Sequence, residues 1–155
     1  MKRELIKNIS ANLPDGSILE GNFTSRIFRN ENSAEMLIYF NCLDYAEDCI
    51  AHFNSMPDDM IDEICHGLIE SCQEDYSVNK DFKLPELENI RNILNYCRFN
   101  TMTVYKMKND SINYAVSGES DWRKFVGFVI KDGTLVYVGF EYEEYLYHDD
   151  MDKYL

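Results

Sequence analysis

Three aspartates, Asp58, Asp59 and Asp62, stand close together in the middle of the chain. On a helix, carboxylates at positions i, i+1 and i+4 can hold a hard cation, and enzymes with this D-D-x-x-D spacing bind Mg²⁺ and diphosphate through it. Such enzymes also need a second metal motif and basic residues for the diphosphate, which this sequence does not show. The solvated face of an amphipathic helix explains the same residues more simply. A metal-dependent enzyme using this cluster is therefore the alternative interpretation.

Thiols and imidazoles near the same segment form a second set of candidate metal ligands. Zinc binds such side chains, and the set comprises Cys49, His52, Cys65, His66 and Cys72. The three cysteines fall on the apolar positions of predicted helices, whereas His66 falls on a polar face. We therefore interpret the cysteines as small core residues and expect no metal or other cofactor.

Nucleophilic catalysis has little support in the sequence. The stretch around Ser120 approaches the G-x-S-x-G nucleophile elbow, but Trp122 replaces the last glycine and a β-hairpin follows instead of a helix. His148, a conceivable triad partner, lies in an acidic tail. A phosphate-binding loop, a dinucleotide fingerprint and H-E-x-x-H are absent from the sequence. We expect no catalytic residues and a protein that is not an enzyme.

Charge is the strongest feature of the sequence. The 28 acidic and 15 basic residues give a formal net charge of −13. Residues 30–79 hold twelve acids and no lysine or arginine, and residues 134–155 hold six acids and one base. This charge argues against nucleic acids and anionic membranes as partners, because both are bound through cationic side chains. It favours a basic protein as the partner.

The acidic tail is also rich in tyrosine, with five tyrosines from Tyr137 to Tyr154. Tyrosine is enriched at interaction hot spots, and the surrounding carboxylates would steer a basic partner. We therefore expect Tyr142, Tyr145 and Tyr147 to anchor a partner. An edge strand whose charges prevent aggregation explains the same stretch equally well.

Helices are predicted to carry the acidic segment. Asp44 and Glu47 match a capping box, and the apolar residues from Tyr45 to Phe53 fall on one helical face. A longer amphipathic helix has Pro57 in its first position and Ser55 or Met56 as its cap. Its apolar stripe is Met60, Ile61, Ile64, Cys65, Leu68, Ile69 and Cys72. A third helix is predicted from Pro85, with Leu87, Ile90, Ile93 and Leu94 directed inward.

Strands are predicted on either side of these helices. Residues 17–29 and 34–42 flank the turn formers Asn30–Ser33 and read as a hairpin. Residues 100–107 and 112–117 follow the helices, and two further strands close the chain at 125–131 and 134–141. The result is an α+β fold, a mostly antiparallel sheet with an N-terminal β-hairpin, two to three central helices and C-terminal β-hairpins.

The last hairpin turns at Asp132-Gly133, since a type I′ turn needs positive φ at both positions. A two-residue loop pairs Val129 with Val136 and Gly127 with Val138. Both faces of this hairpin are apolar. We expect it to be covered on both faces, or to form the interface of a homo-oligomer through residues 125–140.

The length of the chain indicates the number of domains, and its cysteines indicate the cellular compartment. At 155 residues, with no linker-like composition, the chain is predicted to be a single domain, residues 1–155. The sequence shows no signal-peptide pattern and no apolar run of membrane-spanning length. Its five cysteines are odd in number and form no Cys-x-x-Cys pair, so we expect reduced thiols and a cytoplasmic protein.

Two segments together resemble a group of small bacterial domains of unknown function. One is the helix pair carrying Tyr45–Ile50 and Ile61–Cys65, and the other is the W…G-[hydrophobic]₃-x-D-G…V-G hairpin from Trp122 to Gly139. Arg123-Lys124-Phe125 follows the tryptophan where that group has an acidic residue and a His-Gly-like pair. Small acidic proteins of this type are similar to immunity proteins of bacterial toxin systems, and the resemblance implies no catalytic residues.

The favoured hypothesis is a non-catalytic, cytoplasmic protein-binding domain that engages a basic partner, with immunity-type neutralisation of a toxin as its most specific form. The acidic helix face would steer the partner and the tail tyrosines would anchor it. The predicted binding residues are Asp58, Asp59, Asp62, Glu63, Glu70, Tyr142, Tyr145 and Tyr147. The alternatives are the metal-dependent enzyme described above and a self-associating structural protein.

Overall fold

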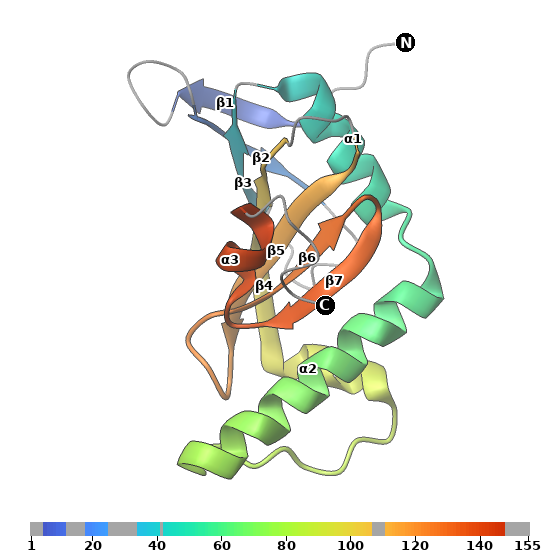
Figure 1. Cartoon of the computed structure of the whole chain (residues 1–155), viewed down its shortest axis with the longest axis vertical. Helices are drawn as coiled ribbons and strands as arrows, with labels where there is room; N and C mark the ends of the chain where they lie inside the picture. The colour runs from blue at the N-terminus through green and yellow to red at the C-terminus, as the bar shows by residue number, and fades with distance from the viewer. Residues whose placement is uncertain (1–4, 12–17, 25–33, 41, 107–110, 148–155) are drawn as a thin grey trace.

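A seven-stranded sheet is the frame of the molecule, and the computed structural model places helices on both of its faces (Figure 1). The structure describes residues 5–11, 18–24, 34–40, 42–106 and 111–147. The strands are β1 Lys7–Ala11, β2 Ile18–Phe23, β3 Ala34–Tyr39, β4 Cys97–Val104, β5 Asn113–Ser120, β6 Val126–Lys131 and β7 Thr134–Gly139. They lie in the order of the chain, and the neighbouring pairs are antiparallel except for β3 and β4. The predicted α+β class with a mostly antiparallel sheet is confirmed.

The parallel pair β3 and β4 exists because the helical segment connects them. A chain that leaves one strand and must begin the next at the opposite end needs a long crossover, which here holds the central helices. The hairpin predicted at the N-terminus is confirmed as β2 and β3, with Phe23 opposite Ala34. The turn formers Asn30–Ser33 lie outside the described residues. The exposed outer strand β1 was not predicted from the sequence.

Two α-helices cover one face of the sheet, α1 Leu43–Asn54 and α2 Asp58–Asn79. The apolar face predicted for the first helix is buried in full, from Tyr45 to Phe53. In α2, four residues of the predicted stripe are buried, and the other three are half-buried against the same core. Helical periodicity therefore located the core of this layer correctly.

The start of each helix differs from its prediction. The capping box at Asp44 and Glu47 is wrong, because Cys42 is the N-cap of α1 and no side chain caps it. The Glu47 carboxylate instead accepts a hydrogen bond from the Leu5 backbone N–H at 3.2 Å. Pro57 is the N-cap of α2 and not its first residue. Both differences are small, since the helices begin within two residues of the predicted positions.

The third helix, predicted from Pro85, is wrong in start and type. The chain leaves α2 through Lys80, whose φ of 59° ends the helix, and runs without regular structure to Asn89. A short 3₁₀ helix, η1, then spans Ile90–Tyr96. The Asn89 side chain caps this helix by accepting a hydrogen bond from the Arg91 backbone N–H at 2.9 Å, which places its start at Ile90. Among the residues predicted to point inward, Ile93 is buried and the others are half-buried against the core, namely Leu87, Ile90 and Leu94.

The C-terminal hairpin of β6 and β7 turns where predicted. Asp132 and Gly133 have φ of 52° and 71°, as a type I′ turn requires. A bulge beyond Ile130 then shifts the register by one, so Val129 faces Tyr137 and Gly127 faces Gly139. The predicted pairs with Val136 and Val138 are therefore wrong, because an extra residue in a strand exchanges the faces of all that follow.

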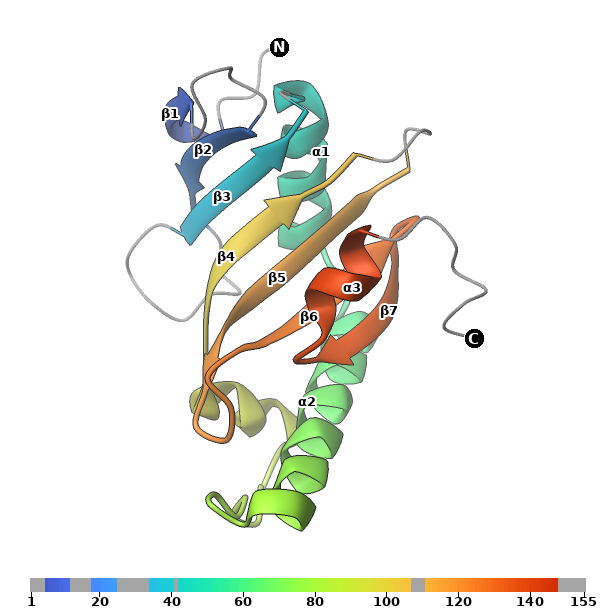
Figure 2. The ribbon, with the colours of Figure 1, turned by 60° about the vertical axis from the view of Figure 1, so that its left-hand side comes forward.

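The opposite face of the sheet carries the last helix, α3 Tyr142–Tyr147, as Figure 2 shows. Its Leu146 is buried with Ala115 of β5 and Val129 of β6. The alternative interpretation of this tail as an edge strand is wrong, since residues 142–147 are helical. Both faces of the β6–β7 hairpin are thus covered within the chain. None of the described helices is long and apolar enough to cross a membrane.

Candidate functional site

A groove of about 690 Å³ separates the second half of α2 from strand β7. Its first wall is a straight stripe of α2, since residues three and four apart share one helical face. Its second wall is β7 with Phe140 directly beyond it, and Arg123 closes one side. The lining residues are Gly67, Glu70, Ser71, Glu74, Asp75, Val78, Arg123, Leu135, Val136, Tyr137, Val138, Gly139 and Phe140. The groove thus lies between a helix and a strand that are distant in the sequence.

The helix wall of the groove is acidic. The side chains of Glu70 and Glu74 are exposed, one helical turn apart. The structure shows no basic side chain within ion-pair distance of either carboxylate among the described residues. Val78 continues the stripe and is 85% exposed, a large value for an apolar residue. This wall therefore offers two free negative charges beside an uncovered apolar side chain.

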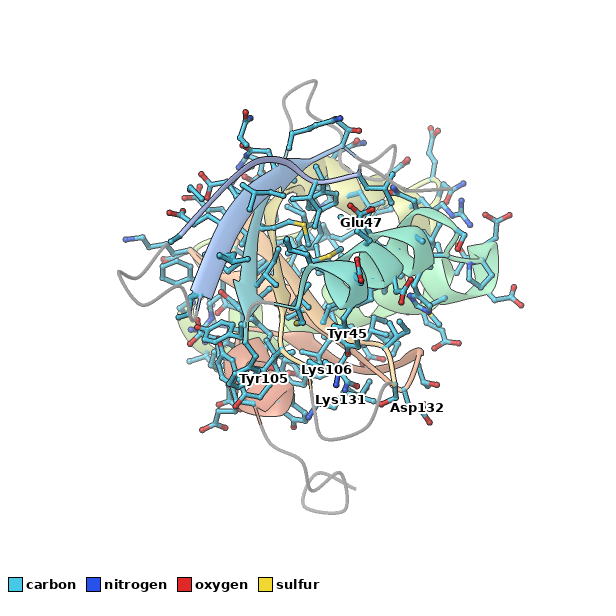
Figure 3. The ribbon with its side chains drawn as sticks, turned by 90° about the horizontal axis from the view of Figure 1, so that it is seen from above. Tyr45, Glu47, Tyr105, Lys106, Lys131 and Asp132 are labelled. Carbon is cyan, nitrogen blue, oxygen red and sulfur yellow. The ribbon has the colours of Figure 1, made fainter. Side chains whose placement is uncertain are left out.

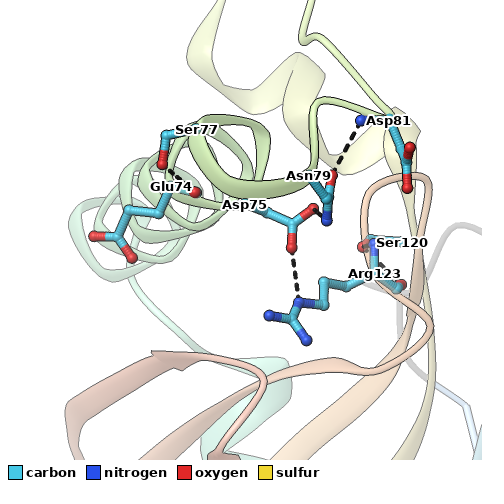
Figure 4. Close-up of polar contacts among 7 residues, drawn as sticks. All are labelled: Glu74, Asp75, Ser77, Asn79, Asp81, Ser120 and Arg123. Carbon is cyan, nitrogen blue, oxygen red and sulfur yellow. Dashed lines mark hydrogen bonds and ion pairs between the residues drawn. The ribbon is translucent and has the colours of Figure 1, made fainter.

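An ion pair between exposed Arg123 and buried Asp75 fixes the side of the groove. The Asp75 side chain is 5% exposed, and its Oδ1 forms an ion pair with Arg123 Nε at 2.8 Å (Figure 4). Its Oδ2 accepts a hydrogen bond from Asn79 Nδ2 at 2.8 Å. The Arg123 guanidinium also lies 3.9 Å from the centre of the Phe140 ring, a cation–π contact. Figure 4 shows the Glu74 carboxylate pointing away from this pair, so Arg123 does not neutralise it.

The strand wall of the groove is the edge of the sheet. β7 pairs with β6 on one side and with no described strand on the other. Tyr137 links this wall to the opposite face of the sheet, because its ring stacks on that of Tyr145 at 4.0 Å between centres. Phe140 remains 47% exposed at the end of the strand. Within the part of the chain that the structure describes, this edge therefore combines backbone that pairs with no strand and aromatic surface.

The chain matches a known protein family. The model of one family, described as a domain of unknown function (DUF6985), matches residues 14–146. The chain belongs to this family. No curated protein and no solved structure gives a significant match. The expected resemblance to domains of unknown function is confirmed, and the function must be argued from the domain's own surfaces.

The first half of α2 differs from the groove wall in that two of its carboxylates form ion pairs. Arg91 of η1 bridges two of the predicted acids, with Nε 2.8 Å from Asp62 Oδ1 and a terminal nitrogen 3.4 Å from Asp58 Oδ1. These carboxylates raise the pKa of Arg91 above its usual value, its hydrogen bond to Asp62 first among the causes. Across the described ranges, no group of three His, Cys, Asp or Glu side chains could hold a metal ion. Two of the three aspartates predicted to bind a cation, Asp58 and Asp62, therefore pair with Arg91.

The remaining predicted acids lie on a different stripe of α2. Asp59 and Glu63 are exposed, and helical spacing places them in line with Glu70 and Glu74. We call these four residues, Asp59, Glu63, Glu70 and Glu74, the acidic ridge. The structure thus separates the predicted acidic face into this ridge and the two aspartates bound to Arg91.

The three tyrosines predicted as anchors lie across the sheet from the ridge and are half-buried. The ring of Tyr142 packs above Gly127, where a Cβ atom would lie 2.8 Å from it. Tyr147 donates a hydrogen bond to the Tyr39 hydroxyl at 3.3 Å, and burial raises its pKa. Tyr145 alone stacks on a residue that lines the groove. These rings pack against their own sheet, and their role as anchors stays a prediction.

The thiols and the remaining polar groups of the helical layer are used in packing. All five cysteines are free, and burial raises the pKa of Cys49 to about 12, which keeps the thiol protonated and inert. His52 accepts from the Tyr114 hydroxyl through Nδ1 at 2.8 Å and donates through Nε2 to the Gly133 carbonyl at 3.2 Å. At the far end of the sheet, Lys106 lies over the Tyr45 ring at 5.9 Å (Figure 3). These contacts give Cys49, His52 and Lys106 a role in packing the fold.

Sequence reasoning found Glu70 but missed the rest of the groove. Glu74 and Asp75 belong to the acidic block that the sequence showed, and Glu74 continues the helix stripe of Glu70 by one turn. Arg123 and Phe140 gave no such signal, because their partners come from other elements. Only the departure at Arg123-Lys124-Phe125 from the resembling group marked the position as unusual.

Proposed function

We propose that this domain is a non-catalytic binding module that holds a basic segment of a protein partner in the groove between α2 and β7. The main support is the groove itself, whose helix wall presents the exposed carboxylates of Glu70 and Glu74, neither of which pairs with a basic side chain of the described residues. Exposed Val78 and Phe140 at its rim add apolar contact area. Binding sites that combine apolar surface with a few placed charges favour defined, charge-complementary partners.

The partner's charge follows from the acidic ridge. Four carboxylates along one side of α2, on a chain with a net charge of −13, attract a basic surface over several ångströms. An anionic partner such as nucleic acid would meet repulsion at the same place. The proposed site therefore retains Asp59, Glu63 and Glu70 from the predicted set and adds Glu74. Tyr145 joins it through the stacked Tyr137.

The most specific form of this proposal is an immunity-type role in the cytoplasm, in which the domain occupies the basic surface of a toxin. The acidic net charge, the small size and the resemblance of the helix pair and hairpin support it. Such neutralisation requires binding only, which fits a groove whose lining holds no His or Cys. Its direct test is co-expression with the captured partner, since the domain would then relieve growth arrest.

Capture from an extract of the native host tests the proposed function. The full-length chain is immobilised, and the bound protein is identified and its affinity measured by calorimetry. The variant Glu70→Lys/Glu74→Lys should weaken binding at least tenfold, because two attractive charges become repulsive. The control Glu20→Lys/Glu35→Lys changes the net charge equally on exposed positions of β2 and β3 and should bind normally. An acidic partner, or equal affinity for both variants, would contradict the proposal.

A further inference from the structure

The groove lies beside the edge of β7, where an additional strand could pair with the sheet. β7 is the last strand of the sheet, and an edge strand directs alternate N–H and C=O groups outward, where another chain can pair with them. Aggregation at such edges is commonly prevented by covering them or by placing charges beside them. Here α2 lies over the face of β7 beside this edge and touches it at Gly67, where a Cβ atom would lie 2.7 Å from Val138. Beyond that contact the groove separates the two elements.

The dimensions of the two walls match an extended peptide. Figures 1 and 2 show α2 and β7 leaning in the same direction, so a strand added to β7 would run along the helix. Glu70 and Glu74 are separated by about 6 Å along the helix axis, from a rise of about 1.5 Å per residue. Side chains on one face of a strand repeat every two residues, about 6.7 Å apart. Two basic side chains at positions i and i+2 of the peptide would therefore meet both carboxylates.

Charge distinguishes the segments that could pair with the edge of β7. Residues 148–155 of this chain carry three aspartates and one lysine, and they would be repelled by Glu70 and Glu74. A second copy pairing its own β7 with this one would bring two acidic ridges together, which is also unfavourable. A basic segment of another protein has the complementary charge. Exposed Phe140 and Val78 then cover its apolar side chains at the end of the groove.

We propose that the partner binds by strand addition, as an extended segment of about six residues that pairs with β7 and places lysine or arginine at alternate positions against α2. The inference rests on the proposed function and specifies how the same groove is used. Backbone pairing would supply affinity without sequence preference, and the alternate basic side chains would supply specificity. The six residues of β7 set the length.

Synthetic hexapeptides test strand addition directly. The probe is acetylated and amidated Lys-Val-Lys-Thr-Lys-Val, and its affinity for the full chain is measured by isothermal titration calorimetry. A strand pairs through every second amide, so methylating one alternate set of peptide nitrogens should weaken binding at least tenfold while methylating the other set changes it little. A Lys-Lys-Lys-Val-Thr-Val peptide of the same composition should bind at least fivefold more weakly. Exchange of β7 amides should slow when the probe is bound.

The outcomes separate the binding mode from the proposed function. Equal effects of the two methylated sets, equal affinity for the rearranged peptide, or no binding of the probe at millimolar concentration would each overturn strand addition. If the captured partner still lost affinity in Glu70→Lys/Glu74→Lys, the acidic groove would remain the binding site with another mode of contact. If that loss were also missing, the proposed function would fall with the inference. The control Glu20→Lys/Glu35→Lys should bind the probe normally.

Discussion

The two halves of α2 carry similar charge but hold it in opposite ways. In the first half, Asp58 and Asp62 share Arg91 at the surface. In the second half, Asp75 is buried and holds Arg123 away from its acidic neighbours, so Glu70 and Glu74 form no ion pair with any described basic side chain. The lesson is that formal charge does not measure binding capacity. What matters is which carboxylates the fold has already supplied with a partner.

The largest expected effect separates the two arginines. Arg123→Met keeps an aliphatic stem over Phe140 but leaves the buried Asp75 carboxylate with Asn79 alone, and we expect a loss of about 2–3 kcal/mol in unfolding free energy. Arg91→Met removes ion pairs at the surface, which are worth about 1 kcal/mol or less. Urea unfolding of both variants measures the difference. Equal losses would show that the two halves of α2 are held alike.

The contact between α2 and β7 provides the second prediction. A glycine-to-alanine change inside a helix normally stabilises by about 1 kcal/mol. Gly67→Ala should instead destabilise by about 1–2 kcal/mol, because its Cβ would lie 2.7 Å from Val138 and force the two walls apart. Ser71→Ala, one turn further along the same wall, is the matched control and should be neutral or slightly stabilising. A stabilised Gly67→Ala would mean that the groove walls are not in contact there.

Local signals in the sequence predicted the elements better than their contacts. The stripe of α2 from Ile64 to Cys72 and the turn at Asp132-Gly133 depend on residues close together, and both are confirmed. The bulge in β7 depends on how its neighbours pack, and it moved Val138 to the helical face and Tyr137 to the other. A pairing rule that counts outward from the turn cannot anticipate an inserted residue.

The candidate site was predicted only in part for a similar reason. The acidic block was plain in the sequence, but its division into a ridge and an arginine-bound pair needs Arg91, which comes from η1. The link between Asp75 and Arg123 spans the β4–β5 hairpin. Ion pairs between distant segments leave no periodic pattern in a sequence, so a charge count treats their members as free.

The stability of the second half of α2 can be tested at alkaline pH through Cys72. This residue lies about one helical turn before Asp75, which lines the groove. Burial first, and then the Asp75 charge, raise the pKa of this thiol from 9.0 to about 11. Between these values the unfolded thiol ionises and the native thiol does not, so the unfolded state binds fewer protons and stability falls as pH rises. The contribution is complete below pH 9 and reaches a slope of at most about 1.4 kcal/mol per pH unit. Cys72→Ala should flatten this part of the curve, and an unchanged slope would contradict the raised pKa.

The smallest expected effect concerns steering by the first half of α2. Asp59→Asn/Glu63→Gln and Asp58→Asn/Asp62→Asn change the net charge by the same amount, but only Asp59 and Glu63 lie in line with the groove. The ridge variant should slow association of the captured partner about two- to threefold at low ionic strength, and the other variant should slow it less. The difference should vanish at about 1 M salt, where charges more than a few ångströms apart are screened. Stopped-flow rates measure it. Equal slowing by both variants would mean that the whole acidic block, rather than the ridge, attracts the partner.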